Sequence, residues 1–261
     1  MRRVRGNIDG TAERGAATGL APFDERCGGL QRGDLVVVAG ETSQGKTSLA
    51  LSMAAHAARP AAYYSLEMRS EQLAARLLAM DTGVPVRDLQ GRPLPAPALQ
   101  RVEQGVERLG GLPLLFDDRC TSNLDTITAS IRAMHARHGI EGAVIDYLQI
   151  LTVNRAEANK EQQMAEAARR LKNLARELGI WVVALSQLNR DTPGTPPVLA
   201  RLRDSGQIAE AADVVMLIYR PEAYGCRYPY PFADRPTAGT AMIDVAKGRN
   251  VGTFRFITAW D

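Results

Sequence analysis

The residues Gly40 to Thr47 read GETSQGKT and fit the pattern G-x-x-x-x-G-K-[ST] completely. Glycines at this spacing let backbone N–H groups close around phosphate oxygens, while the lysine reaches the β- and γ-phosphates. The apolar run LVVVA precedes the pattern, and a helical stretch at about 46–59 directs its positive end at the anion. We therefore predict a loop that binds the phosphates of a nucleotide rather than a glycine turn without function; its residues are Gly40, Thr42, Ser43, Gln44, Gly45, Lys46, Thr47 and Ser48.

A second group of residues could hold a magnesium ion next to this loop. The hydroxyl of Thr47 is one expected ligand. The second candidate is Asp146, which directly follows the apolar run GAVI and so ends an expected buried strand. The alternative for Asp146 is an aspartate that only caps a loop. Together with the phosphate loop, the pattern favours a Mg²⁺ site.

Two more polar residues end apolar runs in the same way. Hydrolysis needs a group that orients and polarises water, and Glu67 follows the run AAYYS closely enough to serve. Gln187 follows the run WVVAL, where it could sense the γ-phosphate and pass its presence to the adjoining loop. The alternatives are a glutamate at a helix start and a glutamine in a surface loop. Carboxyl ends of parallel strands are where ligands bind in open α/β folds, which favours the functional interpretation.

The elements that must position these residues follow from the hydrophobic pattern. Apolar strands alternate with helical stretches, which predicts an α/β fold with a mainly parallel central sheet flanked by helices. Two alternating stretches, AMIDVAKGRN and VGTFRFITAW, predict a C-terminal β-hairpin. The strands are expected at about 35–39, 61–65, 113–116, 142–146, 181–185 and 213–219, and the clearest helices at about 123–138 and 160–178, the latter followed by a capping Gly179.

Composition limits the classes of protein that the chain can belong to. With 261 residues, 45% of them hydrophobic, it can build one sizeable core or at most two small ones. No apolar run approaches about 20 residues, so no membrane span is expected. Three cysteines lie far apart and form no C-x-x-C, which favours a reducing cytoplasm over a disulfide framework. A net charge of +3 permits a nucleic-acid partner without requiring one.

Several strings along the chain are together more specific than the phosphate loop alone. They are LQRGDLVVVAGETSQGKTSLAL, YYSLEMRSEQLAARLLA, VIDYLQIL, ALSQLNR, LRDSGQIAEAADVVMLIYR and VAKGRN, in this order. The chain thereby resembles the C-terminal motor domain of DnaB-type replicative helicases, P-loop NTPases that share the fold of RecA. The resemblance assigns residues 18–261 to the motor domain. Residues 1–17 are then expected to be a flexible N-terminal arm or a linker remnant, as in a minimal version, a fragment or a paralogue with another duty.

The resemblance implies roles for the matching residues. Lys46 and Thr47 would hold the phosphates and Mg²⁺, and Asp146 would be the Walker B acid. The catalytic glutamate would be Glu67 in SLEM, and the γ-phosphate sensor would be Gln187 in SQLNR. Lys247 and Arg249, in AKGRN, resemble the pair that reaches into a neighbouring subunit's ATP, so a monomer should hydrolyse ATP poorly. The alternative for Arg249 is a hairpin-turn arginine in water.

The expected DNA contacts come from two segments. The string LRDSG matches a family loop and makes Arg203, Asp204 and Gly206 the first candidates; Arg155 and Lys160 are the second, against the alternative of a solvated loop. Contacts of this kind are made to phosphates, so binding should be nonspecific and salt-sensitive. The segment 221–239 mixes aromatic and basic residues, which favours a packed loop or a subunit interface over DNA contact.

The resemblance thus implies a ring-forming, ATP-dependent DNA helicase that moves 5′ to 3′ on single-stranded DNA during replication. ATP and Mg²⁺ are its expected cofactors. Its expected partners are single-stranded DNA, further copies of the same chain in a hexamer, and a helicase loader or primase. Two alternatives stay open: a RecA-like, DNA-dependent ATPase that does not unwind DNA, and an ATP-binding assembly module.

Overall fold

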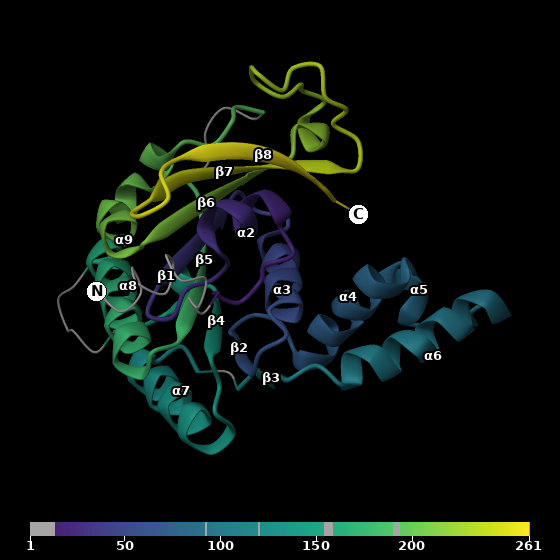
Figure 1. Ribbon diagram of the computed structural model, residues 1–261, viewed down its shortest axis with the longest axis horizontal. Coiled ribbons are helices and arrows are strands. Elements are labelled where there is room, and N and C mark those ends of the chain that lie inside the picture. Colours follow the sequence, from purple (N-terminus) through teal and green to yellow (C-terminus); the bar gives the residue numbers. More distant parts are fainter. Residues whose placement is uncertain (1–13, 92, 120, 154–158, 190–193, 261) are drawn as a thin grey trace.

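The computed structural model describes residues 14–260 except 92, 120, 154–158 and 190–193, and it leaves the side chains of 203–206 undescribed. An eight-stranded sheet with the order β3-β2-β4-β5-β1-β6-β7-β8 forms the middle of the molecule (Figure 1). Its strands are β1 (Leu35–Gly40), β2 (Ala61–Ser65), β3 (Leu114–Asp117), β4 (Gly142–Asp146), β5 (Trp181–Gln187), β6 (Val214–Tyr219), β7 (Thr240–Gly248) and β8 (Phe254–Ala259).

The direction of the strands matches the expectation from the sequence. Strands β1 to β6 pair in parallel with one another, whereas β7 is antiparallel to both β6 and β8. The mainly parallel sheet and the C-terminal hairpin are therefore confirmed. Each of the six strands expected from the apolar runs is present within a few residues of its expected bounds.

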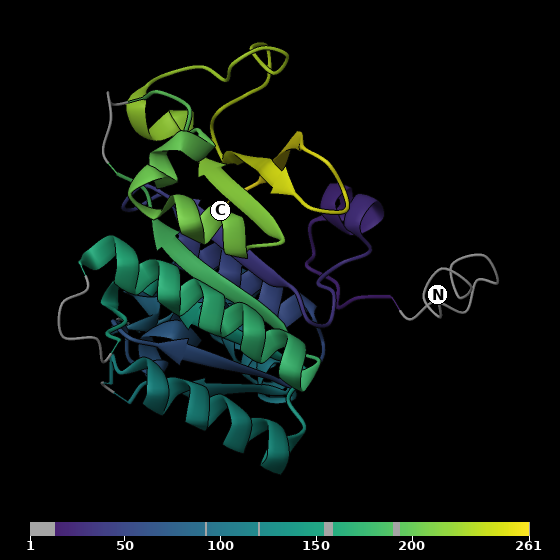
Figure 2. The ribbon, with the colours of Figure 1, turned by 90° about the vertical axis from the view of Figure 1, so that its left-hand side faces the viewer.

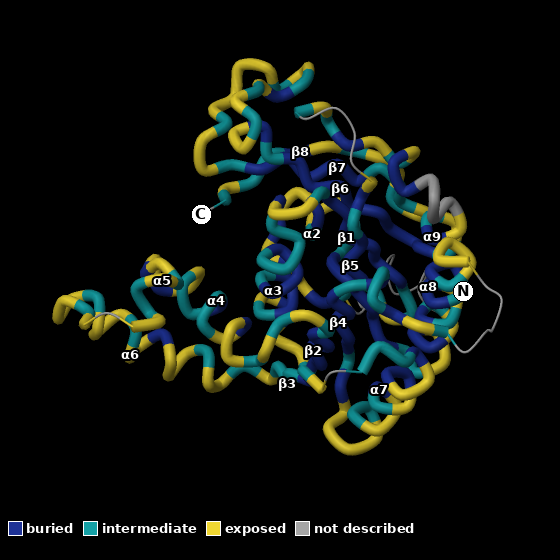
Figure 3. The backbone as a smooth tube through the Cα atoms, turned by 180° about the vertical axis from the view of Figure 1, so that it is seen from behind, coloured by how far each residue is buried: buried dark blue, intermediate teal, exposed yellow. Residues whose placement is uncertain are grey.

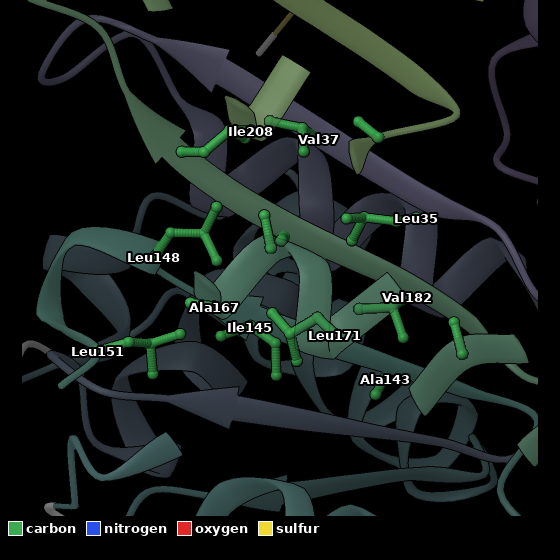
Figure 4. Packing of buried hydrophobic residues seen from close by; sticks show 14 of the residues in the cluster. Leu35, Val37, Ala143, Ile145, Leu148, Leu151, Ala167, Leu171, Val182 and Ile208 are labelled. Atoms are coloured by element: carbon green, nitrogen blue, oxygen red, sulfur yellow. The ribbon is translucent and has the colours of Figure 1, made fainter. Parts of the chain in front are cut away.

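Helices cover both faces of the sheet, because alternate residues of the central strands point to opposite sides. Leu35 and Val37 of β1 pack against α7 (Leu124–His138), α8 (Lys160–Leu178) and α9 (Gly206–Ala211). Figure 4 shows this core from close by, and Figure 2 shows α7 and α8 in front of the sheet. Val36 and Val38 pack on the other face with α2 (Ala21–Cys27), α3 (Lys46–His56) and α4 (Ser70–Thr82). The continuous apolar strands are thus buried on both sides.

Local signals fix the ends of the two helices that the sequence predicts most clearly. The Asn123 side chain accepts hydrogen bonds from backbone N–H groups in the first turn of α7. Asn159 and Gln162 form a capping box at the start of α8, and Gly179 ends that helix in a left-handed conformation. Both helices are confirmed.

A helical projection extends from one end of the sheet, beside β3 (Figure 1). It consists of the end of α4 together with α5 (Val86–Leu89) and α6 (Ala96–Gly110), and Figure 3 shows much of its outer part as exposed. The sequence prediction did not include α6. An apolar groove lies between α4 and α6 and is lined by residues that include Leu77, Leu78, Leu89, Val102, Val106 and Phe116.

The segment 221–239 begins with the short helix η3 (Pro221–Tyr224) and then packs on the hairpin. Tyr228 is buried and meets Tyr219 edge to face, and its hydroxyl lies 2.9 Å from that of Thr240. Tyr230, by contrast, is 88% exposed, and most residues of this segment are exposed as well. The expectation of a packed loop is therefore confirmed for Tyr228. Within the described ranges, none of the helices combines the length and the apolar character that crossing a membrane requires.

Candidate nucleotide-binding site

Four of the predicted site residues meet at the edge of the sheet where the parallel strands end, because these strands run in the same direction and in register. Gly40 at the end of β1 pairs with Gln187 at the end of β5. Asp146 at the end of β4 pairs with Ser65 at the end of β2, two residues before Glu67. The strand order places β4 and β5 directly beside β1. The sheet thus brings together groups that lie up to about 150 residues apart in the chain.

The phosphate loop connects β1 to α3 as the sequence predicts. Gly45 occupies the N-cap of α3 with φ +92°, and Ser43 has φ +63°, so the loop turns through left-handed conformations that glycine favours. Lys46 Nζ donates to the carbonyl oxygens of Gly40 at 3.0 Å and Glu41 at 2.9 Å. The lysine therefore crosses the space enclosed by the loop. Burial lowers the pKa of Lys46, and the negative charges of Asp146, Glu67 and Glu41 oppose that shift.

Asp146 is buried and its Oδ2 atom accepts two hydrogen bonds. Thr47 Oγ1 donates at 2.8 Å, and the hydroxyl of the buried Tyr63 donates at 2.9 Å. Burial raises the pKa of Asp146, which these two hydrogen bonds and the charge of Lys46 partly offset. A hydroxyl and a carboxylate this close together are the oxygen ligands that Mg²⁺ prefers, directly or through water. The residues present therefore fit the expected ion.

Glu67 stands beside these groups on the turn that follows β2. Ser65 Oγ donates to the Met68 carbonyl at 2.6 Å and accepts from the Met68 N–H at 3.2 Å, which closes the turn around Glu67. The backbone N–H of Leu66 also donates to the Asp146 carbonyl at 3.0 Å. Glu67 itself is exposed, and its negative charge acts on Lys46 and Asp146. This is where a group that orients an attacking water has to stand.

Gln187 is connected directly to the phosphate loop. Its Nε2 atom donates to Thr42 Oγ1 at 2.7 Å. Its backbone N–H donates to Gln149 Oε1 at 3.1 Å, and Gln149 Nε2 donates back to the Gln187 carbonyl at 3.1 Å. Gln149 belongs to the 3₁₀ helix η1 (Leu148–Ile150), which follows Asp146 closely. The segment that follows β4 and the end of β5 are thereby held together next to the phosphate loop.

One predicted phosphate-loop residue turns its side chain away from the enclosed space. Gln44 is buried, and its Oε1 accepts from the Arg220 backbone N–H at 2.9 Å while its Nε2 lies 3.3 Å from the Tyr224 hydroxyl. Only its backbone remains for a phosphate. Trp260 is so close to the loop that a Cβ at Gly45 would lie 2.2 Å from its ring.

The two residues predicted to act on a neighbouring subunit lie at the opposite edge of the sheet, where the parallel strands begin. Lys247 pairs with Val215 near the beginning of β6, and Gly248 pairs with Val214. Lys247 Nζ donates to the carbonyl oxygens of Ala212 at 2.8 Å and Glu210 at 3.2 Å, at the end of α9. Burial and the charge of Arg249 lower the pKa of Lys247.

Arg249 is half exposed and contacts the same region. Its Nη1 lies 3.2 Å from Asp213 Oδ1, and its Nη2 donates to the Glu210 carbonyl at 3.1 Å. Asp213 is buried and also accepts from the Leu35 backbone N–H at 2.9 Å and from Lys172. Arg249 is therefore held by its own chain and is not a free arginine in water.

The predicted DNA-contacting residues are only partly covered by the structure. Arg203 and Asp204 belong to the 3₁₀ helix η2 (Leu199–Ser205), and Gly206 begins α9; their side chains lie outside the described part. Lys160 is the exposed first residue of α8, and Arg155 lies outside the described residues.

The sequence prediction missed four residues that build the site. Tyr63 and Gln149 lie inside strings that the prediction quoted, but nothing in one sequence shows which side chain meets Asp146 or Gln187. The other two, Glu41 and Arg201, pair across 160 residues. Opposite charges at such a distance in the chain give no local signal.

The mainly parallel sheet, the phosphate loop after its central strand and the acid at the end of β4 define a P-loop NTPase fold of the RecA-like type. Comparison with known proteins specifies the family. The family model of the DnaB-like helicase C-terminal domain matches residues 15–260. The chain therefore belongs to the DnaB-like helicase C-terminal domain family.

Individual relatives agree with this assignment. The chain is 36% identical over 243 residues to the replicative DNA helicase DnaB of Leifsonia xyli subsp. xyli, covering 90% of this chain and 52% of the relative. It is 36% identical over 245 residues to the replicative DNA helicase DnaB of Treponema pallidum, covering 92% and 53%. The chain thus spans about half the length of these curated relatives.

Two solved structures share the fold. One, described as the ATPase domain of G40P, superposes with a TM-score of 0.87 at 24% identity and covers 98% of this chain and 92% of its own. The other is described as a DnaB-like replicative helicase and its interactions with primase. It gives a TM-score of 0.88 at 24% identity and covers 99% of this chain and 64% of its own.

Proposed function

We propose that this chain is the ATP-hydrolysing motor of a DnaB-type DNA helicase, which moves 5′ to 3′ on single-stranded DNA during replication. One observation carries the proposal. Lys46, Glu67, Asp146 and Gln187 gather at one edge of the sheet, while Lys247 and Arg249 stand at the other. A chain built in this way presents one half of a hydrolysis site at each edge.

Each residue at the first edge has a task that follows from its position. Lys46 and the backbone N–H groups of the loop bind the β- and γ-phosphates. Thr47 and Asp146 hold the magnesium ion, which neutralises phosphate charge when it is bound. Exposed Glu67 orients the attacking water and accepts its proton. Gln187 exchanges its hydrogen bond with Thr42 for one with the γ-phosphate, and so distinguishes ATP from ADP.

The distance between the two edges is the reason for action in a neighbouring subunit. Strand β1 has six residues, so its ends are separated by about 17 Å at about 3.3 Å per residue. An arginine side chain cannot span that distance to its own phosphate loop. Arg249 and Lys247 therefore serve the ATP of the next copy in a ring, for which we propose a hexamer. An arginine supplied in this way is worth about 10³–10⁵ in rate.

Single-stranded DNA is proposed to contact the segment from η2 to α9, with Arg203, Asp204 and Gly206 first, and Arg155 and Lys160 second. Primase or a helicase loader is the proposed protein partner; the name of one structural neighbour mentions primase. Residues 18–261 form the proposed motor and residues 1–17 the proposed arm or linker, in a cytoplasmic protein.

Unwinding of a forked DNA by the purified chain, with ATP turnover measured in parallel, tests this proposal. Wild type should unwind the fork and should hydrolyse ATP faster when single-stranded DNA is added. Lys46→Ala should abolish both, because it removes the cation that crosses the phosphate loop between the Gly40 and Glu41 carbonyls. Near-normal turnover by Lys46→Ala would refute the assignment of the loop. DNA-stimulated turnover without unwinding would instead favour the alternative of a DNA-dependent ATPase that needs a further domain or partner.

Mixing two inactive variants tests action between subunits. Arg249→Ala keeps its own Glu67, and Glu67→Ala keeps its own Arg249, so a mixed oligomer contains some complete sites. We expect each variant alone to lose at least about 10³-fold in turnover, and the mixture to recover part of it. Arg255→Ala is the matched control because Arg255 pairs with the buried Asp244 at 2.8 Å and is 44% exposed, yet lies on β8. The absence of recovery in the mixture would count against sites shared between subunits.

A further inference from the structure

We propose that Arg201 is a positioning residue which, through its ion pair with Glu41, couples the phosphate loop to the segment that contacts DNA. The inference rests on the proposed function, because it assigns DNA contact to the residues that follow Arg201 in η2 and α9. It goes beyond that function by naming the side-chain contact through which the two sites influence each other.

The ion pair joins two elements that the chain keeps far apart. Glu41 is the second residue of the phosphate loop, directly after Gly40, and Arg201 is the third residue of η2. Arg201 Nη2 donates to Glu41 Oε1. The pair is largely removed from water, since 7% of the Arg201 side chain and 19% of the Glu41 side chain are exposed. Breaking one partner of such a pair costs much more than breaking a surface pair, because the other charge stays buried.

The same guanidinium also binds the exit of the strand that carries Gln187. Arg201 Nη2 donates to the Asn189 carbonyl at 2.6 Å, and Nε donates to the same oxygen at 3.2 Å. Asn189 follows Gln187 by two residues, and Gln187 in turn donates to Thr42. One side chain from η2 is thus connected to both elements of the ATP site that are expected to respond to the γ-phosphate.

At the loop end of the connection, both the side chain and the carbonyl of Glu41 accept hydrogen bonds. Glu41 Oε2 accepts a hydrogen bond from the Tyr224 hydroxyl, so both carboxylate oxygens are engaged. Burial, followed by the hydrogen bond to Glu41 and its charge, raises the pKa of Tyr224 to about 12, which keeps the phenol protonated as a donor. The Glu41 carbonyl also accepts from Lys46 at 2.9 Å. A shift of Lys46 toward a bound phosphate therefore acts directly on Glu41.

The η2 end of the connection has one feature that favours a second arrangement. Arg201 Nη1 is buried and has no hydrogen-bond partner within the described part of the chain. A buried donor without a partner costs free energy, so an arrangement in which it gains an acceptor is favoured when the surroundings change. Leu202, next in the chain, is buried in the core, so we expect a movement of Arg201 to shift η2 relative to that fixed residue. Residues 203–206 follow immediately.

The experiment measures coupling as a ratio. The dissociation constant of a fluorescent single-stranded oligonucleotide is determined at one salt concentration, with a non-hydrolysable ATP analogue and again with ADP. The two effects are reciprocal: if a nucleotide changes the affinity for DNA by some factor, DNA changes the affinity for that nucleotide by the same factor. For wild type we expect the two constants to differ by at least about fivefold, the lower end of ordinary coupling energies. For Glu41→Gln and for Arg201→Gln we expect the ratio to fall close to one.

A conservative variant separates coupling from a merely structural role. Arg201→Lys keeps a cation that can donate to the Glu41 carboxylate or to the Asn189 carbonyl, so it should retain part of the wild-type ratio. Glu41→Arg, which places two cations side by side, should not fold or should lose the ratio. Arg255→Ala, which breaks the Arg255–Asp244 pair on the hairpin, should keep the wild-type ratio.

Three results would overturn the inference. The first is a wild-type ratio in Arg201→Gln, together with reduced stability, since the pair would then only support the fold. The second is an Arg201→Lys variant that folds but keeps no more of the ratio than Arg201→Gln does. The third is a wild type whose DNA affinity does not depend on the nucleotide. A wild type that does not bind the oligonucleotide at all refutes the proposed function itself, and is thereby distinguished from the other outcomes.

Discussion

The hydroxyl of Tyr63 provides the sharpest test of how the site is built. Tyr63 is fully buried in the face of the sheet that α3 covers, and its hydroxyl donates to Asp146 Oδ2 at 2.9 Å. Tyr63→Phe removes one oxygen atom and keeps the ring against Phe116, whose centroid lies 5.9 Å away. The variant therefore isolates the effect of a single hydrogen bond on the carboxylate that we assign to the magnesium site.

The size of the effect follows from the kind of bond that is lost. A hydrogen bond to a charged group contributes about 1.5–3 kcal/mol. At about 1.4 kcal/mol for each factor of ten, this corresponds to roughly 10- to 100-fold, the range found for groups that orient a metal ligand. Thr47 still donates to the same oxygen at 2.8 Å, so the carboxylate keeps one of its two side-chain donors. We therefore expect about a tenfold weaker apparent Mg²⁺ affinity, the lower end of that range.

The assay is a Mg²⁺ titration of nucleotide binding, followed by tryptophan fluorescence. Trp260 lies against Gly45 of the phosphate loop, whereas Trp181, the only other tryptophan, is buried in the core. Turnover is measured separately at low and at saturating Mg²⁺. The loss of turnover caused by Tyr63→Phe should be smaller at saturating Mg²⁺ than at low Mg²⁺.

Tyr64→Phe is the matched control. Tyr64 is the next residue, is equally buried and loses a hydroxyl that donates to Ser130 at 3.2 Å, but it lies on the opposite face of the sheet. The reasoning is refuted if both variants show the same Mg²⁺ dependence, or if Tyr63→Phe loses stability without a change in that dependence.

Two further predictions concern the sheet that carries the site. Gly142→Ala should lower the free energy of unfolding by about 1–3 kcal/mol or more, because the new Cβ would lie 2.0 Å from the Trp181 ring; chemical denaturation measures this. Gly139→Ala is the control. A Cβ there would meet no atom within 4 Å, so it tests strain from the positive φ alone. Hydrogen bonds from Arg119 hold the pKa of Asp117 below its usual range. Asp117 therefore stabilises the fold at pH values above its unfolded pKa of about 3.9. This stabilisation is lost as the pH falls through the lower pKa of the folded state. The stability difference between wild type and Asp117→Asn, measured by urea denaturation, should therefore be largest near neutral pH and shrink below about pH 4; a difference that grows on acidification would contradict this.

The parts of the fold that the sequence predicts are those set by local chemistry. Continuous apolar runs predict buried parallel strands, and Gly179 predicts the C-terminal end of α8. Helix α6 was missed although Leu99, Val102, Val106 and Leu109 follow helical spacing, because Gly and Pro surround the segment and favour a loop interpretation. The groove that it forms with α4 depends on contacts between separate helices, which periodicity does not contain.

The candidate site divides in the same way. Residues that end strands, such as Asp146 and Gln187, could be predicted because parallel strands deliver their carboxyl ends to one edge. The partners that hold them could not, since they are set by sheet order and by side-chain direction. Arg249 illustrates the difference: its place in the hairpin is predictable, but its contacts with Asp213 and the end of α9 depend on how β6 and β7 pair.

The placement of Lys247 and Arg249 at the edge opposite the phosphate loop has a consequence for how activity depends on concentration. If each chain supplies its arginine to the next, contacts between copies are head to tail, and an open assembly holds one complete site fewer than it has members. Closure adds the missing site and abolishes the idle end. Turnover per chain should then rise steeply as dilute protein assembles and level off once closure is reached. In a chain that has no neighbour at this side, Arg249 stays paired with Asp213. An unassembled chain therefore does not expose a free guanidinium.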